Sequence, residues 1–410
     1  MSPTVSGAPV PEKLAIDSGH PVRNKPFAPW PAFTREDIEA VSGVLRSGRV
    51  NYWTGDEGRL FEQEFARYTD VKYAVAVASG TVALELALYA LGIGPGAEVI
   101  TPGRTFIASA SCIALRGAIP VMADVDRDSQ TITAQSVREV ITPRTRAIIA
   151  VHLAGWPCDM DSILQVAEEY ELAVIEDCAQ AHGARYKGRP VGSMGHIGAF
   201  SFCQDKTMTT GGEGGMLTMS YEALWNRASS YRDHGRNYQA AHEGSHQPGF
   251  RWLSDSFGTN WRLTEMQSAL GRSMLRRLDQ SVDRRTQLAG KMNQAMAGIP
   301  AVRTTLPGEA IYHSYYKYYV FIRLERLRPN WNRDRIAAAI EAEGIPCSSG
   351  SCSEIYLERA FEGMRPPHRL LVAKELGETS LMFLVHPTLS DIDIQDTIAA
   401  VEKVMQHASY

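Results

Sequence analysis

Short apolar runs alternate with amphipathic segments through the first two thirds of the chain. The runs have the length and β-branched content of buried strands and occur at residues 73–78, 98–101, 120–124, 147–151, 173–176, 197–202 and 216–219. Apolar residues at helical spacing occupy residues 82–91 and 107–115 between them. Because strands buried on both faces read as nearly continuous apolar runs, the pattern predicts a mostly parallel sheet covered by helices.

The two ends of the chain have different patterns. Residues 1–29 are rich in Pro, Gly and Ser without periodicity, which indicates a flexible N-terminal tail. Thr34-Arg-Glu-Asp37 resembles a capping box that opens a helix through Leu45. After residue 275 the pattern predicts a long charged helix over 276–296, a strand over 315–324 and helices over 333–343 and 391–407. The division is therefore a tail (1–29), a large α/β domain (30–275) and a smaller α+β C-terminal domain (276–410).

Composition narrows the class of protein. The chain has 410 residues, a formal net charge of -4 and no clustering of Lys or Arg, which disfavours nucleic acid or an anionic membrane as a partner. No apolar run approaches the roughly 18 residues of a membrane span, and no signal pattern is present. The six cysteines are widely spaced, without the paired spacing of a metal site, so we expect no metal and a reducing, cytoplasmic location.

Two side chains at predicted strand ends carry the chemistry. Lys206 lies between the apolar run 197–202 and a glycine cluster at Gly211–Gly215. Asp177 ends the apolar run that begins at residue 173. A lysine that can form a Schiff base, with an acid that can pair with a pyridinium nitrogen, is the combination expected for pyridoxal 5′-phosphate (PLP). Lys206 and Asp177 are therefore the candidate catalytic pair.

Other residues at strand ends are candidate cofactor ligands. Gly80 and Thr81 open a predicted helix directly after a strand, which suits a phosphate, although Ser79-Gly-Thr81 could equally be an ordinary helix cap. Gln180 could donate to a ring hydroxyl. Phe106 could stack on a flat ring or belong to the core.

Three further features have less specific interpretations. The glycine cluster lacks the GxxxxGK[ST] pattern, so a tight turn beside the lysine is favoured over a nucleotide-binding loop. His182 is expected to be structural or to support the site instead of acting as a base. An irregular stretch over 237–250 is expected to form a loop.

Five motifs in a fixed order resemble one known family. They are SGT at 79–81, TFIAS at 105–109, EDCAQAHG at 176–183, SFCQDKTMTTGGEGG at 201–215 and GTNWRLTEMQSALG at 258–271. In this order they are similar to the DegT/StrS-like sugar aminotransferases, a group of fold-type-I PLP-dependent enzymes. The resemblance runs from about residue 24 to the C-terminal helix. It implies the aspartate aminotransferase-like fold, with a large PLP-binding domain.

The resemblance also implies roles for single residues. Lys206 would hold PLP as a Schiff base, and Asp177 would pair with the pyridine nitrogen. Gly80, Thr81 and Ser201 would bind the phosphate, with Phe106 over the ring and Gln180 near its hydroxyl. Asn260 matches an asparagine that reaches the neighbouring subunit's phosphate in relatives, which implies a homodimer with shared active sites. Arg262 is a weaker candidate for substrate contact.

The implied activity is transfer of an amino group from glutamate or glutamine to a keto-sugar, which the resemblance implies to be nucleotide-linked. The alternatives are a PLP-dependent sugar dehydratase, a cyclitol aminotransferase and a non-catalytic regulatory protein with this fold. Dehydratase relatives typically have histidine in place of the lysine, so Lys206 counts against that alternative. Residues 348–356 (SSGSCSEIY) replace a His-Tyr-Pro-Pro-Leu-His type segment of many relatives. This departure leaves the identity of the acceptor open.

Overall fold

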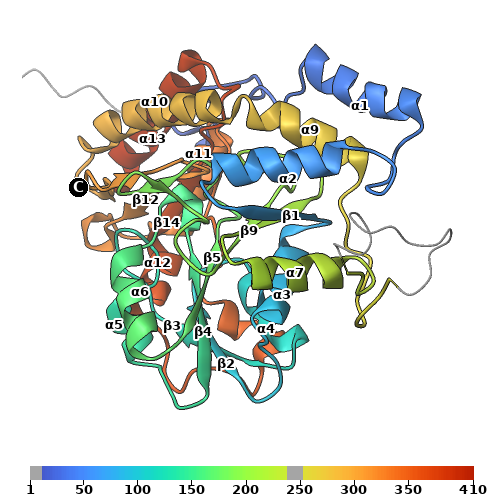
Figure 1. Ribbon diagram of the computed structural model, residues 1–410. Helices are drawn as coiled ribbons and strands as arrows, with labels where there is room; N and C mark the ends of the chain where they lie inside the picture. The colour runs from blue at the N-terminus through green and yellow to red at the C-terminus, as the bar shows by residue number, and fades with distance from the viewer. Residues whose placement is uncertain (1–11, 238–252) are drawn as a thin grey trace, which may run out of the picture.

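The computed structural model describes residues 12–237 and 253–410. A seven-stranded sheet of order β1-β9-β8-β5-β4-β2-β3 forms the centre of the large lobe (Figure 1). The strands are β1 (Tyr73–Val77), β2 (Glu98–Pro102), β3 (Ile119–Ala123), β4 (Thr145–Val151), β5 (Ala173–Asp177), β8 (Ile197–Ser201) and β9 (Gly215–Met219). Only β9 runs antiparallel to its two neighbours, so the prediction of a mostly parallel sheet is confirmed.

Helices cover both faces of this sheet because alternate strand residues point to opposite sides. Val75 and Val77 of β1 belong to one apolar cluster with the buried residues of α3. Ala74 and Ala76 belong to a second cluster with residues of α2 and α9. The helices of the large lobe are α1 (Arg35–Ser47), α2 (Glu57–Tyr68), α3 (Gly80–Ala90), α4 (Ala108–Leu115), α5 (Ala134–Arg138), α6 (Met160–Glu169), α7 (Glu222–Arg232) and α9 (Glu265–Leu275).

The small lobe has its own apolar core around an antiparallel sheet of order β10-β12-β14-β13. Its strands are β10 (Val302–Arg303), β12 (Tyr318–Ile322), β13 (Cys347–Ser348) and β14 (Ser380–Phe383), and its helices are α10 (Leu278–Met296), α11 (Arg333–Ala342), α12 (Leu371–Thr379) and α13 (Asp391–Ala408). A third sheet joins β11 (Ile311–Tyr312) to β6 (Arg185–Tyr186) and β7 (Arg189–Pro190). The lobes are thus connected by paired strands as well as by α10.

The segment before α1 is ordered where the structure describes it. Residues 12–29, assigned by the sequence pattern to a flexible tail, pack on the small lobe, and Leu14 is buried in its core. The carboxylate of Glu343 accepts hydrogen bonds from the backbone N–H of Ala15 (2.8 Å) and of Val22 (3.0 Å). Arg23 pairs with Asp393 at 2.7 Å. The hydrogen bonds of Glu343 and the ion pair of Arg23 therefore hold this segment in place, although its sequence has no helix or strand periodicity.

Parts of two predictions lie outside the described residues. They are the start of the tail (1–11) and most of the loop expected over 237–250. The domain limit at residue 275 stays a prediction. Among the described helices, none combines the length and the apolar character needed to cross a bilayer.

Candidate active site

The carboxyl ends of five strands meet at a cavity of about 620 Å³ between the two lobes. Its large-lobe lining includes Ser79–Thr81 after β1, Thr105 and Phe106 after β2, Val151 of β4, Asp177 of β5, and Ser201, Cys203, Asp205 and Lys206 at and after β8. The small lobe contributes Tyr316, Lys317, Tyr319, Gly350–Cys352 and Met382. Ligands of open α/β sheets bind at this edge, so the cavity is the candidate active site.

The turn from β1 into α3 lies unusually close to the end of β8. A Cβ added to Gly80 would lie 2.5 Å from the Cβ of Ser201, so no larger residue fits without a shift. Ser79 caps α3, because its hydroxyl accepts a hydrogen bond from the N–H of Val82 at 3.3 Å. Ser79 therefore has the structural role considered above, while Gly80 and Thr81 remain at the positive end of the helix dipole.

Asp177 is buried at the base of the cavity. The Ser109 hydroxyl donates to its Oδ2 at 2.8 Å, and the backbone N–H of Ala179 donates to its Oδ1 at 3.1 Å. The Thr105 hydroxyl lies 2.9 Å from that of Ser109. Burial raises the pKa of Asp177 above its ordinary value, against the opposing effects of these donors and of the positive charge of Lys206. A cation bound next to this carboxylate would remove the cost of its burial.

A hydrogen bond fixes the orientation of the Gln180 side-chain amide. Its Oε1 accepts a hydrogen bond from the backbone N–H of Ala154 at 2.9 Å. Because the oxygen is used in this way, the amide NH₂ is the group left for the cavity that Gln180 lines. The geometry thus fits a donor to a ring hydroxyl.

Lys206 lies in the turn that follows β8, with its Nζ 4.9 Å from the centroid of the Tyr316 ring. The indole Nε1 of Trp30, from the N-terminal segment, donates to the Lys206 carbonyl at 2.9 Å. Gly211, Gly212 and Gly214 have φ values of 90°, 130° and 154°, which L side chains rarely adopt. The glycines therefore form the turn between the lysine and β9.

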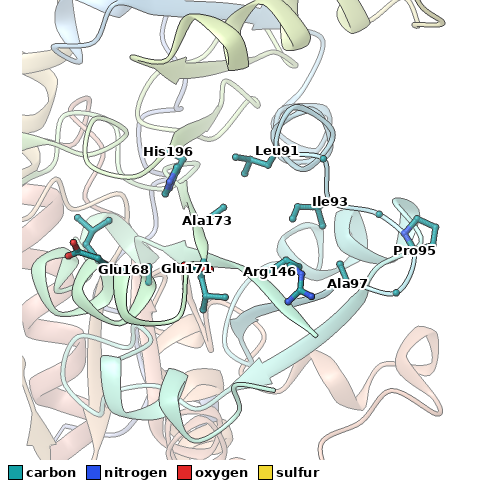
Figure 2. A pocket seen from close by; sticks show the side chains of 15 residues that line it. Leu91, Ile93, Pro95, Ala97, Arg146, Glu168, Glu171, Ala173 and His196 are labelled. Carbon is teal, nitrogen blue, oxygen red and sulfur yellow. The ribbon is translucent and has the colours of Figure 1, made fainter. Parts of the chain in front are cut away.

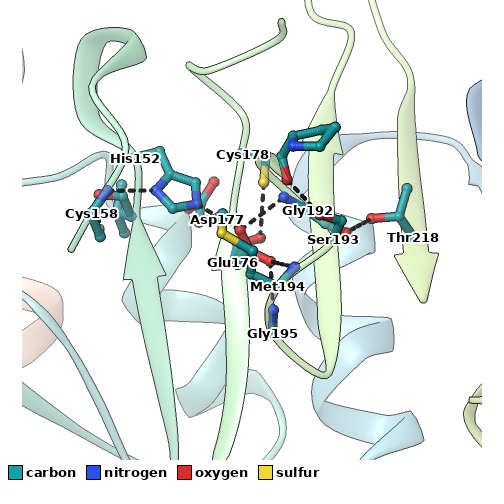
Figure 3. Close-up of polar contacts among 12 residues, drawn as sticks. His152, Cys158, Glu176, Asp177, Cys178, Gly192, Ser193, Met194, Gly195 and Thr218 are labelled. Carbon is teal, nitrogen blue, oxygen red and sulfur yellow. Dashed lines mark hydrogen bonds and ion pairs between the residues drawn. The ribbon is translucent and has the colours of Figure 1, made fainter. Parts of the chain in front are cut away.

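Glu176 points to the opposite side of β5 from Asp177 and binds the segment that leads into β8 and the residue that follows β4 (Figure 3). Its Oε1 accepts from the backbone N–H groups of Met194 (2.7 Å) and Gly195 (2.7 Å), and its Oε2 accepts from Gly192 (2.8 Å). His152 Nε2 lies 3.0 Å from the same Oε2. Burial alone would raise the pKa of Glu176, but His152 and these N–H groups outweigh it and lower the pKa.

The hydrogen bonds also fix the proton of His152. The backbone N–H of Cys158 donates to His152 Nδ1 at 3.0 Å, so the ring proton lies on Nε2 and points to Glu176. The ligand atoms of His152, Glu176 and Cys178 lie within 4.8 Å of one another. Since N–H donors already occupy the histidine and carboxylate lone pairs, this cluster is explained as a structural support of the strand that carries Asp177.

The segment that departs from the family pattern forms the small-lobe wall of the cavity. The backbone N–H of Ser351 donates to Tyr319 Oη at 2.9 Å. Arg104, fully buried, donates to the Ser353 hydroxyl at 2.5 Å and to Gln130 Oε1 at 3.0 Å. Gly350 has φ 80°, and a Cβ there would lie 2.2 Å from Tyr319 Oη. The wall is therefore held by residues of both lobes and offers small, neutral groups to a ligand.

Of the remaining predicted residues, the structure places some in the cavity and others outside it. Phe106 lines the cavity with its side chain largely exposed, as a ring-stacking residue requires. Asn260 is exposed and does not line this chain's cavity, and Arg262 forms an ion pair with Asp233. Burial lowers the pKa of His182 to about 3, which makes it a poor base.

Sequence reasoning missed Asp205, Tyr316 and Lys317 as cavity residues. Tyr316 Oη donates to Asp205 Oδ2 at 2.5 Å, and Lys317 Nζ lies 3.5 Å from the same oxygen. Asp205 is next to the lysine in sequence, which was an available signal. The two small-lobe residues lie in an aromatic run that reads as an ordinary strand.

A larger cavity, of about 1150 Å³, lies at the opposite edge of the sheet (Figure 2). Its lining includes Ala97, Arg146, Ala173 and His196, at the amino ends of β2, β4, β5 and β8. His196 Nδ1 accepts from the backbone N–H of Val174 at 3.0 Å, and burial lowers its pKa. No lysine lines this cavity in the described part of the chain, so its size does not make it the reactive site.

Comparisons with known proteins identify the family of the chain. The sequence matches the DegT/DnrJ/EryC1/StrS aminotransferase family over residues 31–402. A solved aminotransferase from Psychrobacter cryohalolentis has a TM-score of 0.91 and 53% identity, covering 93% of this chain and 99% of that chain. S. venezuelae DesV, solved in complex with a ketimine intermediate, has a TM-score of 0.83 and 34% identity, covering 93% and 99%.

A curated relative extends the agreement. The dTDP-3-amino-3,4,6-trideoxy-alpha-D-glucose transaminase of Streptomyces venezuelae is 38% identical over 343 residues, which are 83% of this chain and 84% of that protein. The family match spans both lobes and all the residues that line the cavity. The chain therefore belongs to the DegT/DnrJ/EryC1/StrS aminotransferase family.

Proposed function

We propose that this protein transfers an amino group from glutamate or glutamine to a keto-sugar, with PLP as its cofactor. The observation that carries the proposal is the convergence of Lys206, Asp177 and the N-terminus of α3 on one cavity. Fold alone would not require a free amine, a buried acid and an anion-binding helix end in the same place.

The residues of the cavity fit the cofactor chemically. Gly80 and Thr81, with the Ser201 hydroxyl, would hold the phosphate at the start of α3, where the helix dipole favours an anion. Asp177 is a buried carboxylate that needs a cation, which a protonated ring nitrogen supplies. Phe106 would cover the ring, and the Gln180 amide would donate to its hydroxyl. The space of about 620 Å³ suits the cofactor together with a substrate.

Asp177 and Lys206 would then have separate roles in the reaction. PLP, when bound, acts as an electron sink for the carbon that loses its proton. Asp177 would keep the ring nitrogen protonated, and its own position is fixed by Ser109 and by the Glu176 network behind it. Lys206 would hold the cofactor through its amine and would also move the proton as acid and base.

Two observations support a sugar as acceptor. The wall formed by Gly350–Cys352 is small and neutral, which leaves room for a polyhydroxylated ring. The similar transaminase of Streptomyces venezuelae is named for a dTDP-linked amino sugar, which supports a nucleotide-linked substrate. Lys206 favours amino transfer over dehydration, because the dehydratase chemistry works without a lysine at this position.

The exposed position of Asn260 supports a homodimer with shared sites. This residue lies outside its own chain's cavity, in the segment that leads into α9. A second copy of the chain would bring Asn260 to the phosphate of the neighbouring site, as the family resemblance implies.

Turnover against a panel of nucleotide-linked keto-sugars, with glutamate or glutamine as donor, tests the proposed acceptor. We expect one or more of them to be converted to the amino sugar, detected by mass spectrometry. Efficient amination of small keto acids, with no reaction of any keto-sugar, would instead identify an amino-acid aminotransferase.

A further inference from the structure

The cavity has a second lysine that the chemistry above does not use. Among the described residues that line it, Lys206 and Lys317 are the only cationic side chains. Lys206 is committed to the cofactor and must lose its charge to act as a base. Lys317 is therefore the cation available to a substrate.

Lys317 and Lys206 both lie near the ring of Tyr316 and line the same cavity. The Nζ of Lys317 is 4.8 Å from the centroid of the Tyr316 ring, and the Nζ of Lys206 is 4.9 Å from the same centroid. The Lys317 side chain is 17% exposed, so it is largely withdrawn from solvent. A cation in the same cavity as Lys206 is available to a carboxylate on the carbon that carries the transferred nitrogen.

The ammonium group of Lys317 is only partly neutralised. Asp205 Oδ2 lies 3.5 Å from Lys317 Nζ, beyond a good hydrogen bond, and it already accepts the Tyr316 hydroxyl. Burial lowers the pKa of Lys317, which Asp205 offsets in part. An additional anion against Nζ would keep the lysine charged and satisfy its remaining donors.

Another nearby cation is unsuited to this role. Arg285 is almost fully buried, and its Nη1 donates to the carbonyl oxygens of Tyr315 (3.4 Å) and Tyr316 (3.2 Å). It does not line the cavity. Arg285 therefore supports the segment that carries Lys317 instead of facing a ligand.

We propose that Lys317 binds the α-carboxylate of the amino donor. The inference rests on the proposed aminotransferase function and adds the donor's recognition site to it. Glutamate and glutamine share this carboxylate, whereas their distal groups differ in charge. A single lysine in the same cavity as Lys206 thus accounts for recognition of either donor, and the donor's α-carboxylate would face the small lobe.

The test compares the wild-type holoenzyme with Lys317→Met and Lys317→Arg in the donor half-reaction. The loss of the visible absorbance is followed with glutamate, glutamine and 4-aminobutyrate, which lacks the α-carboxylate. Loss of a charge-assisted hydrogen bond predicts that Lys317→Met raises KM for glutamate and glutamine about tenfold to a hundredfold, with a smaller change in kcat. Lys317→Arg should retain most of the affinity, and 4-aminobutyrate should react alike with all three proteins.

A binding measurement separates this inference from the proposed function. Calorimetry with 2-oxoglutarate, which has the same α-carboxylate but no amine, should show the same weakening in Lys317→Met. Lys374→Met, on α12 and outside the cavity, is the matched control and should bind as wild type. If the wild type reacts with neither glutamate nor glutamine, the proposed function is rejected. The calorimetry with 2-oxoglutarate would still decide whether Lys317 binds an α-carboxylate.

The inference is overturned by either of two results. One is a Lys317→Met enzyme whose KM for both donors and affinity for 2-oxoglutarate stay within twofold of wild type. The other is an equal loss with 4-aminobutyrate, which would assign Lys317 a structural role.

Discussion

Substitution of Glu176 should destabilise the protein strongly, although this residue does not line the active-site cavity. In Glu176→Gln one carboxylate oxygen becomes an NH₂ group, and two of the four surrounding N–H donors lose their acceptor. Those donors are His152 Nε2 and the backbone groups of Gly192, Met194 and Gly195, all within 3.0 Å of the carboxylate. Each buried unsatisfied donor costs about 1–3 kcal/mol, so the two together predict a loss of about 2–6 kcal/mol.

The loss of stability in Glu176→Gln should be larger at neutral pH than in acid. The pKa of Glu176 is lowered in the folded protein, so its carboxylate contributes stability above the ordinary glutamate pKa. That contribution disappears as the pH falls below about 4.5 toward the lowered value. The difference in stability between wild type and Glu176→Gln should therefore be full at pH 7 and shrink in acid.

Urea unfolding at several pH values measures this difference. The matched control is Glu168→Gln on α6, an exposed glutamate that should change the midpoint little. A Glu176→Gln midpoint that corresponds to less than 0.5 kcal/mol at pH 7, on the order of a surface substitution, would refute the reasoning. A difference that stays constant down to pH 4 would contradict the assigned charge.

Two further predictions concern the cofactor site and the assembly. Gly80→Ala places a methyl group against Ser201, so PLP affinity measured by absorbance titration should fall at least about tenfold with the fold intact; unchanged affinity would remove the turn from the phosphate site. Mixing the inactive Lys206→Ala and Asn260→Asp proteins should restore part of the activity on subunit exchange, because one site of each heterodimer has neither lesion. Proven heterodimers without activity would show that each chain builds a complete site.

The ends of buried strands could be predicted from the sequence, and with them most of the candidate site. Asp177 and Ser201 each end an apolar run, and parallel strands bring such ends to one edge of the sheet. Glu176 shows the limit of this reasoning. Its four donors come from segments up to 24 positions away, and no local pattern reveals that they meet.

The small-lobe residues of the cavity could not be predicted for a local reason. The sequence from residue 315 to 324 reads as one strand, but β12 begins at Tyr318. Before it, Tyr315 has φ 46°, and its N–H donates to His313 Nδ1 at 2.8 Å. The chain is thus bent where the aromatic run suggests extension, and the bend places Lys317 in the cavity.

The ordered packing of residues 12–29 could not be predicted from the sequence, because only tertiary contacts hold this segment in place. Glu343 lies more than 300 positions away and is the acceptor for two of their backbone groups. Pro, Gly and Ser in this segment indicate only the absence of a helix or strand, which the structure largely agrees with. This composition does not indicate which distant side chains bind the backbone of the segment.

The central claim is that Lys206 carries the cofactor and the proton in an amino transfer. Its most direct test is the visible absorbance of the purified protein with PLP, for wild type and for Lys206→Ala, before and after addition of glutamate or glutamine. We expect the wild type to be yellow, to bleach with the donor and to recover its colour with a keto-sugar. We expect Lys206→Ala to form no such covalent band and to lose turnover by several orders of magnitude. A Lys206→Ala protein that shows the wild-type band and near-normal turnover would contradict the account.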